Sequence, residues 1–118
     1  MMKIYAFDVD ETLEVSEGPI PLEALKNLVN EGHIVGLCGN WAVVTNRVWK
    51  WWHWASFIGP MGITKEDFLI QLKKYIPVEE VVMVGNILGV SGRSDDQGAA
   101  ERAGVRFISE KDFAEGKR

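Results

Sequence analysis

Cysteine and basic residues are both scarce in this chain. Cys38 is the only cysteine among its 118 residues, which excludes a disulfide within the chain and fits a reducing compartment. The 13 lysines and arginines are outnumbered by 17 aspartates and glutamates, which gives a formal net charge of −4. Because proteins that bind nucleic acids are usually basic, this charge balance does not indicate a nucleic-acid partner. It leaves open a phosphorylated substrate that local groups hold.

Long apolar runs are also lacking. No stretch approaches the roughly 20 residues that a membrane span requires. The first residues show no apolar core followed by a small-residue cleavage site, as a signal peptide would. We therefore expect a cytoplasmic protein with no membrane partner. The chain has 47% hydrophobic and 25% charged residues, so residues 1–118 are expected to form one domain with a substantial core.

The sequence does contain short apolar runs that alternate with segments of helical pattern. Strands are predicted over residues 3–9, 33–38, 56–59, 79–85 and 105–108. Helices are predicted over residues 21–32, 40–54, 65–76, 94–104 and 110–116. Strands that alternate with helices predict an α/β protein, with a parallel sheet that helices cover on both faces.

Two pairs of acidic residues fall where such a sheet places a binding site. Asp8 and Asp10 follow the first strand, and Asp95 and Asp96 lie in the loop or helix start after the fourth strand. Ligands of open parallel sheets bind beyond the carboxyl ends of the strands. Two like charges ~4 Å apart cost roughly 4 kcal/mol at an effective dielectric constant of ~20, and a divalent cation relieves that repulsion. The two pairs together favour an oxygen-rich metal site.

Each pair also has a purely structural interpretation. Asp95 and Asp96 follow Ser94, and the spacing from Ser94 to Gln97 is that of a capping box at a helix start. The pattern Asp-x-Asp alone is a weak signal, because acidic turns are common. Glu11, which follows Asp10, is expected to be solvated.

The segment IYAFDVDETL, residues 4–13, resembles the first motif of the haloacid dehalogenase superfamily, an apolar strand followed by Asp-x-Asp-x-Thr. Asp8, Asp10 and Thr12 fill its three positions. Residues 81–108 resemble the last motif of that family, an apolar strand followed by Gly-Asp, an Asp-led helix and Ala-Gly-Val before the last strand. The resemblance implies a three-layer α/β/α Rossmann-like sandwich with a parallel sheet of about five strands. The intervals after the first two motifs are too short for a cap domain.

The resemblance also implies a hydrolase, a Mg²⁺-dependent phosphatase that works through an aspartyl-phosphate. Asp8 would be the nucleophile, Asp10 the general acid and base, and Thr12 would help to fix the loop. Mg²⁺ would bind Asp8, the backbone carbonyl of Asp10 and an acid of the last motif. Lys65 stands where the family has a lysine that steadies the nucleophile and the phosphoryl oxygens. Its alternative is a solvated lysine in the first turn of a helix.

The second motif departs from the family pattern. A Ser or Thr normally binds phosphate at the end of the second strand, but this chain has Cys38, Gly39 and Asn40 there. Asn40 or backbone N–H groups could replace that donor. Cys38 is a poor substitute, and we expect it to be a small buried apolar residue.

The last motif departs as well. Asn86 replaces the aspartate of Gly-Asp, and its carbonyl oxygen can coordinate a metal but brings no charge. Asp95 or Asp96 would then supply the missing carboxylate. Asp96 matches the family's helix-leading aspartate better.

All five tryptophans lie between residues 41 and 54. A helix over residues 40–54 would carry four apolar side chains on one face, which is typical of packing against a sheet. These are Trp41, Val48, Trp49 and Trp52. Trp54 would lie on the opposite side and Trp51 at the margin, so an exposed patch at these two would meet a partner or a second subunit.

Three functions follow from these features. The leading prediction is a minimal, capless phosphatase that acts on a phosphorylated small molecule or on an exposed macromolecular phosphate. The departures at Cys38 and Asn86 instead allow a catalytically degenerate scaffold, which binds or regulates through the tryptophan-rich segment. A phosphate-accepting switch domain would also use Asp8 and a metal, but would keep a long-lived aspartyl-phosphate.

Overall fold

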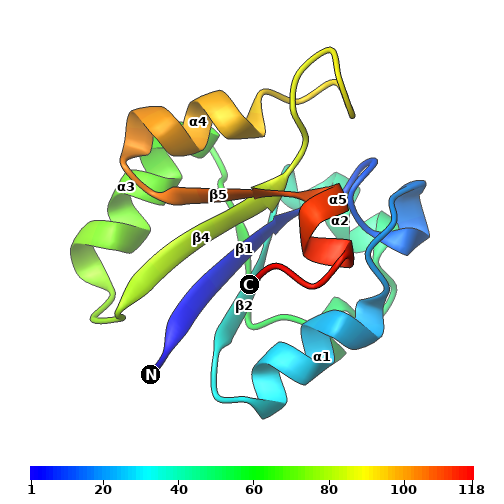
Figure 1. The fold of residues 1–118 in the computed structure, drawn as a ribbon, viewed down its shortest axis with the longest axis horizontal. Helices are drawn as coiled ribbons and strands as arrows, with labels where there is room; N and C mark the ends of the chain where they lie inside the picture. Colours follow the sequence, from blue (N-terminus) through cyan, green and yellow to red (C-terminus); the bar gives the residue numbers. More distant parts are fainter.

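A five-stranded parallel sheet lies between two layers of helices in the computed structural model, which describes all residues from 1 to 118 (Figure 1). The strands are β1 (Lys3–Asp8), β2 (Ile34–Cys38), β3 (Phe57–Gly59), β4 (Glu80–Gly85) and β5 (Arg106–Ser109). They lie in the order β3-β2-β1-β4-β5, and each neighbouring pair is parallel. The predicted Rossmann-like α/β sandwich is confirmed, and no cap domain interrupts it.

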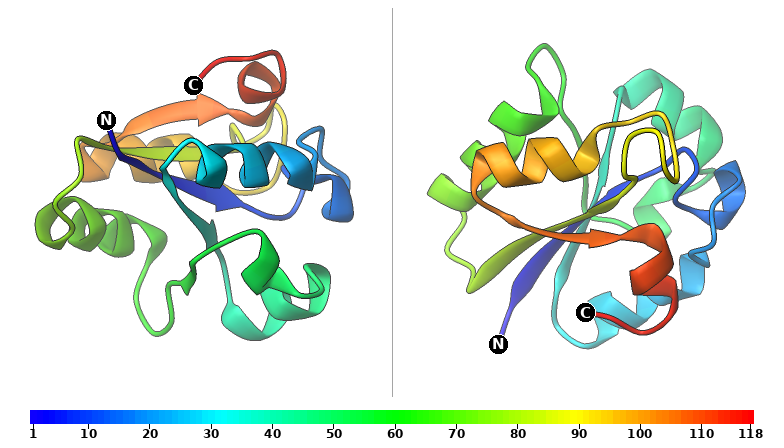
Figure 2. Two further views of the ribbon diagram at one scale, coloured as in Figure 1. Left: turned by 90° about the horizontal axis from the view of Figure 1, so that it is seen from below. Right: turned by 45° about the horizontal axis from the view of Figure 1, so that its top comes forward.

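The helices divide between the two faces of the sheet (Figure 2). They are α1 (Leu22–Asn30), α2 (Trp41–Arg47), α3 (Lys65–Tyr75), α4 (Asp96–Ala103) and α5 (Glu110–Ala114), with short 3₁₀ turns η1 (Glu14–Ser16) and η2 (Trp51–His53). Side chains of α1, α2 and α5 enter one buried cluster, and those of α3 and α4 enter the other. A membrane-spanning segment is not found among these helices.

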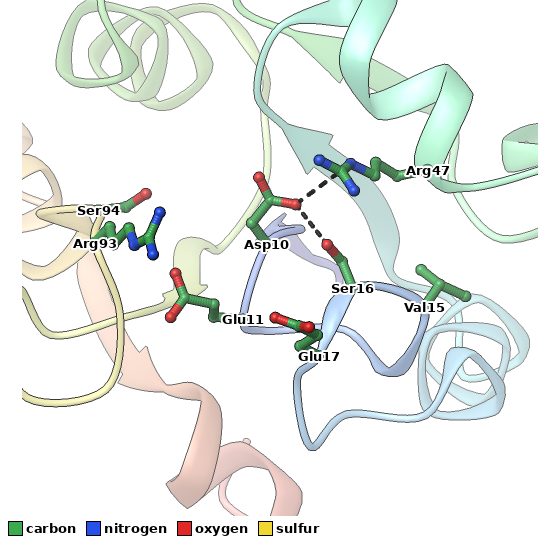
Figure 3. A pocket seen from close by; sticks show the side chains of 8 residues that line it. All are labelled: Asp10, Glu11, Val15, Ser16, Glu17, Arg47, Arg93 and Ser94. Atoms are coloured by element: carbon green, nitrogen blue, oxygen red, sulfur yellow. Dashed lines mark hydrogen bonds and ion pairs between the residues drawn. The ribbon is translucent and has the colours of Figure 1, made fainter.

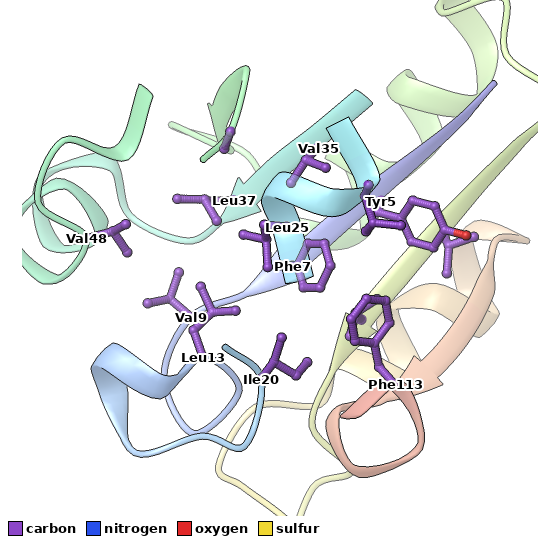
Figure 4. Close-up of a cluster of buried hydrophobic side chains, with 14 of the residues drawn as sticks. Tyr5, Phe7, Val9, Leu13, Ile20, Leu25, Val35, Leu37, Val48 and Phe113 are labelled. Atoms are coloured by element: carbon purple, nitrogen blue, oxygen red, sulfur yellow. The ribbon is translucent and has the colours of Figure 1, made fainter. Parts of the chain in front are cut away.

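The central strand β1 is buried on both faces because its side chains alternate between the two clusters. Tyr5 and Phe7 point toward α1 and α5, whereas Ile4 and Ala6 point toward α3 and α4. Phe113 packs edge-on against both aromatic rings, with centroids 6.3 Å from Tyr5 and 5.2 Å from Phe7 (Figure 4). Burying an aromatic side chain of this size stabilises the fold by about 1.5–3 kcal/mol. The carboxyl end of β1 therefore emerges from a tightly packed core.

The strand order reverses between β1 and β4, and this point is the place where open parallel sheets bind ligands. Phe7 pairs with Val84 across the two strands. Asp8 and Gly85, the last residues of β1 and β4, consequently lie beside each other at the carboxyl end of the sheet. The fold thus brings the first and last predicted motifs together.

The predicted helix over residues 40–54 is wrong in its second half. Helix α2 ends at Arg47, and Lys50 adopts a left-handed conformation with φ of 52°, so the chain turns before η2. The turn reverses the predicted burial of several tryptophans: Trp51 and Trp54 are half-buried against the core. The exposed tryptophans are instead Trp41, Trp49 and Trp52, at 46%, 78% and 62%.

Candidate functional site

Asp8 is the buried centre of the candidate site. Only 5% of the residue is exposed, because it continues the central strand β1. One carboxylate oxygen, Oδ1, lies 3.2 Å from Nζ of Lys65, and the other, Oδ2, accepts a hydrogen bond from Oγ1 of Thr12 at 3.3 Å. Both oxygens of this carboxylate are therefore held in place by residues of the predicted site.

Lys65 connects Asp8 to the last motif. It is the first residue of α3, where the Thr64 side chain caps the helix by accepting a hydrogen bond from the Asp67 N–H at 3.1 Å. Its ammonium group lies 2.6 Å from Oδ1 of Asp96 as well as 3.2 Å from Asp8. The structure thus joins three residues far apart in the sequence, and the interpretation of Lys65 as a solvated lysine is wrong.

Asp96 and Asn86 complete the buried centre. Asp96 is 1% exposed, and its Oδ2 accepts a hydrogen bond from the backbone N–H of Asn86 at 2.8 Å. The Asn86 amide donates through Nδ2 to the carbonyl of Glu11 at 3.0 Å, and its Oδ1 lies 3.4 Å from Oγ1 of Thr12. The Thr12 hydroxyl can donate its single proton to only one of these two acceptors, Asp8 or Asn86, at a time. The oxygen atoms of two predicted metal ligands therefore lie around the same hydroxyl.

Asp95 lies away from this centre. Its Oδ1 accepts a hydrogen bond from the Gly98 N–H at 3.0 Å and so caps α4, and its Oδ2 lies 3.5 Å from Nη1 of Arg102. The predicted capping box that begins at Ser94 is therefore wrong, because the helix begins one residue later. Of the two aspartates of the last motif that were predicted as metal ligands, Asp96 reaches the centre and Asp95 points toward the surface.

The centre places two carboxylates beside a single ammonium group. Burial raises the pKa of Asp8 to about 7; the ammonium of Lys65 opposes this shift, and the Asp96 carboxylate adds to it. Burial would lower the pKa of Lys65, but Asp8 and Asp96 together raise it above its usual range. When Asp8 and Asp96 are both ionised, the ammonium of Lys65 balances only one of the two negative charges.

The oxygen donors at the centre fit Mg²⁺. No three His, Cys, Asp or Glu side chains gather closely enough to form a metal site by themselves. The oxygen atoms gathered at the centre are instead those of the Asp8 and Asp96 carboxylates and of the Asn86 amide. Mg²⁺ prefers oxygen ligands and is usually bound through one or two carboxylates, waters and substrate phosphate. A bound cation would also balance the negative charge that remains when both carboxylates are ionised.

Asp10 lies at the mouth of the site and does not contact Asp8. Its Oδ1 accepts a hydrogen bond from Oγ of Ser16 at 2.5 Å and lies 3.8 Å from Nε of Arg47 (Figure 3). Asp8, Asp10 and Lys65 nevertheless line one small pocket of about 230 Å³. The two carboxylates of the first motif therefore line the same pocket, Asp8 in its buried part and Asp10 at its exposed edge.

Of the four predicted phosphate-binding residues, Cys38, Gly39 and Asn40 line the same small pocket. The fourth, Thr12, is fully buried and its hydroxyl faces Asp8 and Asn86 instead. Burial raises the pKa of the Cys38 thiol to about 12, so this group stays neutral, and the prediction of a small buried residue is confirmed. The Gly39 N–H donates to the Gly59 carbonyl at 2.8 Å. The Asn40 side-chain oxygen caps α2 by accepting from the Ala42 N–H at 3.0 Å. This cap leaves the Asn40 NH₂ group as a donor beside the pocket.

Several glycines that sequence reasoning missed shape the centre. A Cβ atom on Gly85 would lie 2.3 Å from Oδ2 of Asp96, and one on Gly92 would lie 2.5 Å from Cγ of Asn86. Both positions therefore require glycine for these side chains to occupy the centre. The only sequence signal for this is the high glycine content between residues 85 and 104.

A comparison with protein-family models, curated proteins and solved structures found no match to this chain. The resemblance to the haloacid dehalogenase superfamily therefore rests on the two sequence motifs alone.

Proposed function

We propose that this chain is a Mg²⁺-dependent phosphatase of the haloacid dehalogenase type, which forms an aspartyl-phosphate on Asp8. The observation that carries the proposal is the ammonium of Lys65, which lies 3.2 Å from Asp8 and 2.6 Å from Asp96 at the reversal of strand order. Purely structural acidic turns would not need a shared, half-buried lysine from a third segment.

The reaction begins with attack by a carboxylate oxygen of Asp8 on the phosphorus of a phosphate monoester. The bond from phosphorus to the ester oxygen breaks, and Asp10 protonates the departing alcohol from the mouth of the pocket. Asp10 then takes a proton from water, which attacks the phosphorus, releases inorganic phosphate and restores Asp8. Lys65 holds the nucleophile in place and offsets its charge. Bound Mg²⁺ supplies positive charge that reduces repulsion between the Asp8 carboxylate and the phosphate.

The function is tested by phosphate release from an aryl phosphate in the presence of Mg²⁺. We expect turnover that a chelator abolishes, and that added Mg²⁺ restores. Asp96→Asn should lower kcat/KM by roughly tenfold or more, since a hydrogen bond to a charged group is worth about 1.5–3 kcal/mol. Asp95→Asn is the matched control and should retain activity, because Asp95 caps α4 and pairs with Arg102 away from the centre. The absence of turnover across a broad panel of phosphate esters would contradict the proposal.

Gly85→Ala is expected to reduce activity through the position of Asp96. The added methyl group would meet Oδ2 of Asp96, which already binds the Asn86 N–H, so the carboxylate must move. We expect kcat/KM to fall by roughly tenfold or more, since loss of a charged hydrogen bond costs about 1.5–3 kcal/mol.

Gly32→Ala is the control for this substitution. Gly32 has φ of 92° and free space around it, so alanine there costs backbone strain without touching the site. We expect Gly32→Ala to lower the free energy of unfolding, by about 1 kcal/mol, and to leave kcat/KM unchanged. Equal activity of both variants would show that Gly85 does not position Asp96.

A binding function through the tryptophan-rich segment is the second candidate. It is favoured by the exposure of Trp41, Trp49 and Trp52. A protein that binds Mg²⁺ but releases no phosphate from any ester would support this function. A switch domain would instead accumulate a long-lived aspartyl-phosphate.

A further inference from the structure

A second pocket, of about 480 Å³, opens beside Asp10 (Figure 3). Its volume lies within the range of about 300–1,000 Å³ that is usual for small-molecule sites. Of the eight residues that line it, only Val15 is hydrophobic. The pocket is therefore suited to a small, strongly polar molecule.

This pocket adjoins the space in front of the nucleophile. Asp10, Arg47 and Ser94 line both the large pocket and the smaller one that contains Asp8 and Lys65. A phosphate ester whose phosphorus faces Asp8 would therefore extend its alcohol part past Asp10 into the large pocket.

Two arginines reach into the large pocket from opposite sides of Asp10 (Figure 3). Arg47 comes from the end of α2, and its only ion pair is the 3.8 Å contact with Asp10, between two half-exposed side chains. Arg93 comes from the loop between β4 and α4, and its side chain has no ion pair or hydrogen bond within the protein. A guanidinium presents several N–H donors in a planar fork, which fits a carboxylate or a phosphate. Both arginines are thus available to a ligand.

Glu11 and Glu17 add acceptors to the same wall. Both have left-handed backbones, with φ of 60° and 68°, a conformation that costs a non-glycine residue about 1 kcal/mol or more. Such strain is concentrated at functional sites. A neutral apolar ligand would leave these charges and the Arg93 guanidinium unpaired. The complementary ligand carries an anionic group together with hydroxyl or ammonium donors.

We infer that the substrate is a small phosphate monoester whose alcohol part carries a second anionic group, a carboxylate or another phosphate, held between Arg47 and Arg93. This inference rests on the proposed phosphatase function and names the substrate class of the same site. The preference comes from the arginines, because Lys65 contacts the reacting centre and not the large pocket.

The test compares three esters with Mg²⁺ present: glycerol phosphate, phosphoglycerate and glycerol bisphosphate. They share a three-carbon alcohol and differ in whether it carries a second charge, and the last two separate carboxylate from phosphate recognition. We expect kcat/KM for at least one doubly anionic ester to exceed that for glycerol phosphate by roughly tenfold or more. The double variant Arg47→Gln/Arg93→Gln should lose this preference.

Lys74→Gln is the control variant, because it removes one positive charge near the end of α3, outside both pockets. It should keep the preference. Equal kcat/KM values for the three esters in the wild type, or a preference that survives in the double variant, would overturn the inference.

The proposed phosphatase function and the inferred anion site can fail separately. If no ester is hydrolysed, that function fails, and calorimetric titration of the same esters decides the inference alone. Tighter binding of a doubly anionic ester that the double variant loses would support the anion site. Equal or absent binding of all three would overturn it.

Discussion

Asp8→Asn is expected to abolish phosphate release, with kcat lowered by roughly 10⁴-fold or more, as for the loss of other catalytic nucleophiles. An amide is a poor nucleophile and cannot form the aspartyl-phosphate. The measurement is the initial rate on an aryl phosphate at saturating Mg²⁺. A variant that keeps activity within tenfold of the wild type would show that Asp8 is not the nucleophile.

The same variant is expected to be more stable than the wild type at neutral and higher pH in the presence of a chelator. Burial raises the pKa of Asp8 to about 7, compared with about 4 in an unfolded chain. Between these values the native protein holds a proton that the unfolded chain has released, so wild-type stability falls as the pH rises from about 4 to 7. Asparagine does not ionise, so the variant escapes this loss.

The difference in the free energy of unfolding between Asp8→Asn and the wild type should therefore be small near pH 4. It should reach a few kcal/mol above about pH 7, since one pKa unit corresponds to about 1.4 kcal/mol. Urea denaturation at several pH values measures it. A wild type that is more stable than Asp8→Asn at about pH 8 without metal would contradict the burial argument. Lost activity with gained stability would mark Asp8 as a group retained for chemistry and not for folding.

Lys65→Met is expected to have the second largest effect, and it acts on stability as well as on activity. Removal of the ammonium leaves Asp8 and Asp96 as buried carboxylates without a cation. Breaking a buried ion pair from one side costs about 3–5 kcal/mol. We expect a loss of about 3 kcal/mol in the free energy of unfolding at neutral pH, because Lys65 is partly exposed, and loss of measurable turnover.

Two further variants test whether the loss of stability comes from the contacts of Lys65 with Asp8 and Asp96 or from removing any lysine of α3. Lys74→Met removes an exposed lysine from the same helix and should change stability little. Adding Asp96→Asn to Lys65→Met removes one of the unpaired charges, so it should restore part of the stability and none of the activity. A Lys65→Met protein as stable as the wild type would show that the three groups are not coupled.

Much of the fold follows from local patterns that one sequence displays. The apolar run before Asp8 predicts a buried central strand, and Thr64 with Asp67 predicts the start of α3, because caps and strand patterns act over a few residues. The position of Asp8 beside the last motif also follows, since parallel strands present their carboxyl ends at one edge.

The tryptophan-rich segment shows where such patterns fail. Residues 40–54 contain neither proline nor glycine, so nothing in the sequence predicts the left-handed turn at Lys50. That turn places Trp51 and Trp54 against the core and exposes Trp49. Tertiary packing here overrides helical periodicity.

The site itself depends on contacts between distant residues. The family resemblance favours Asp96 over Asp95, but the start of α4 decides which one points inward. Gly85 lies close to Asp96, and Arg47 and Arg93 line one pocket, although no spacing rule connects these segments. These features required the three-dimensional arrangement.

The central claim, that Asp8 forms a covalent phosphoenzyme, is tested most directly by borohydride reduction during turnover. Borohydride converts an aspartyl-phosphate into homoserine, which peptide mass spectrometry assigns to a position in the chain. We predict homoserine in place of Asp8 when Mg²⁺ and a phosphate ester are both present, and none when either is omitted. Active turnover without homoserine, or homoserine at Asp10 or Asp96 instead, would contradict the claim.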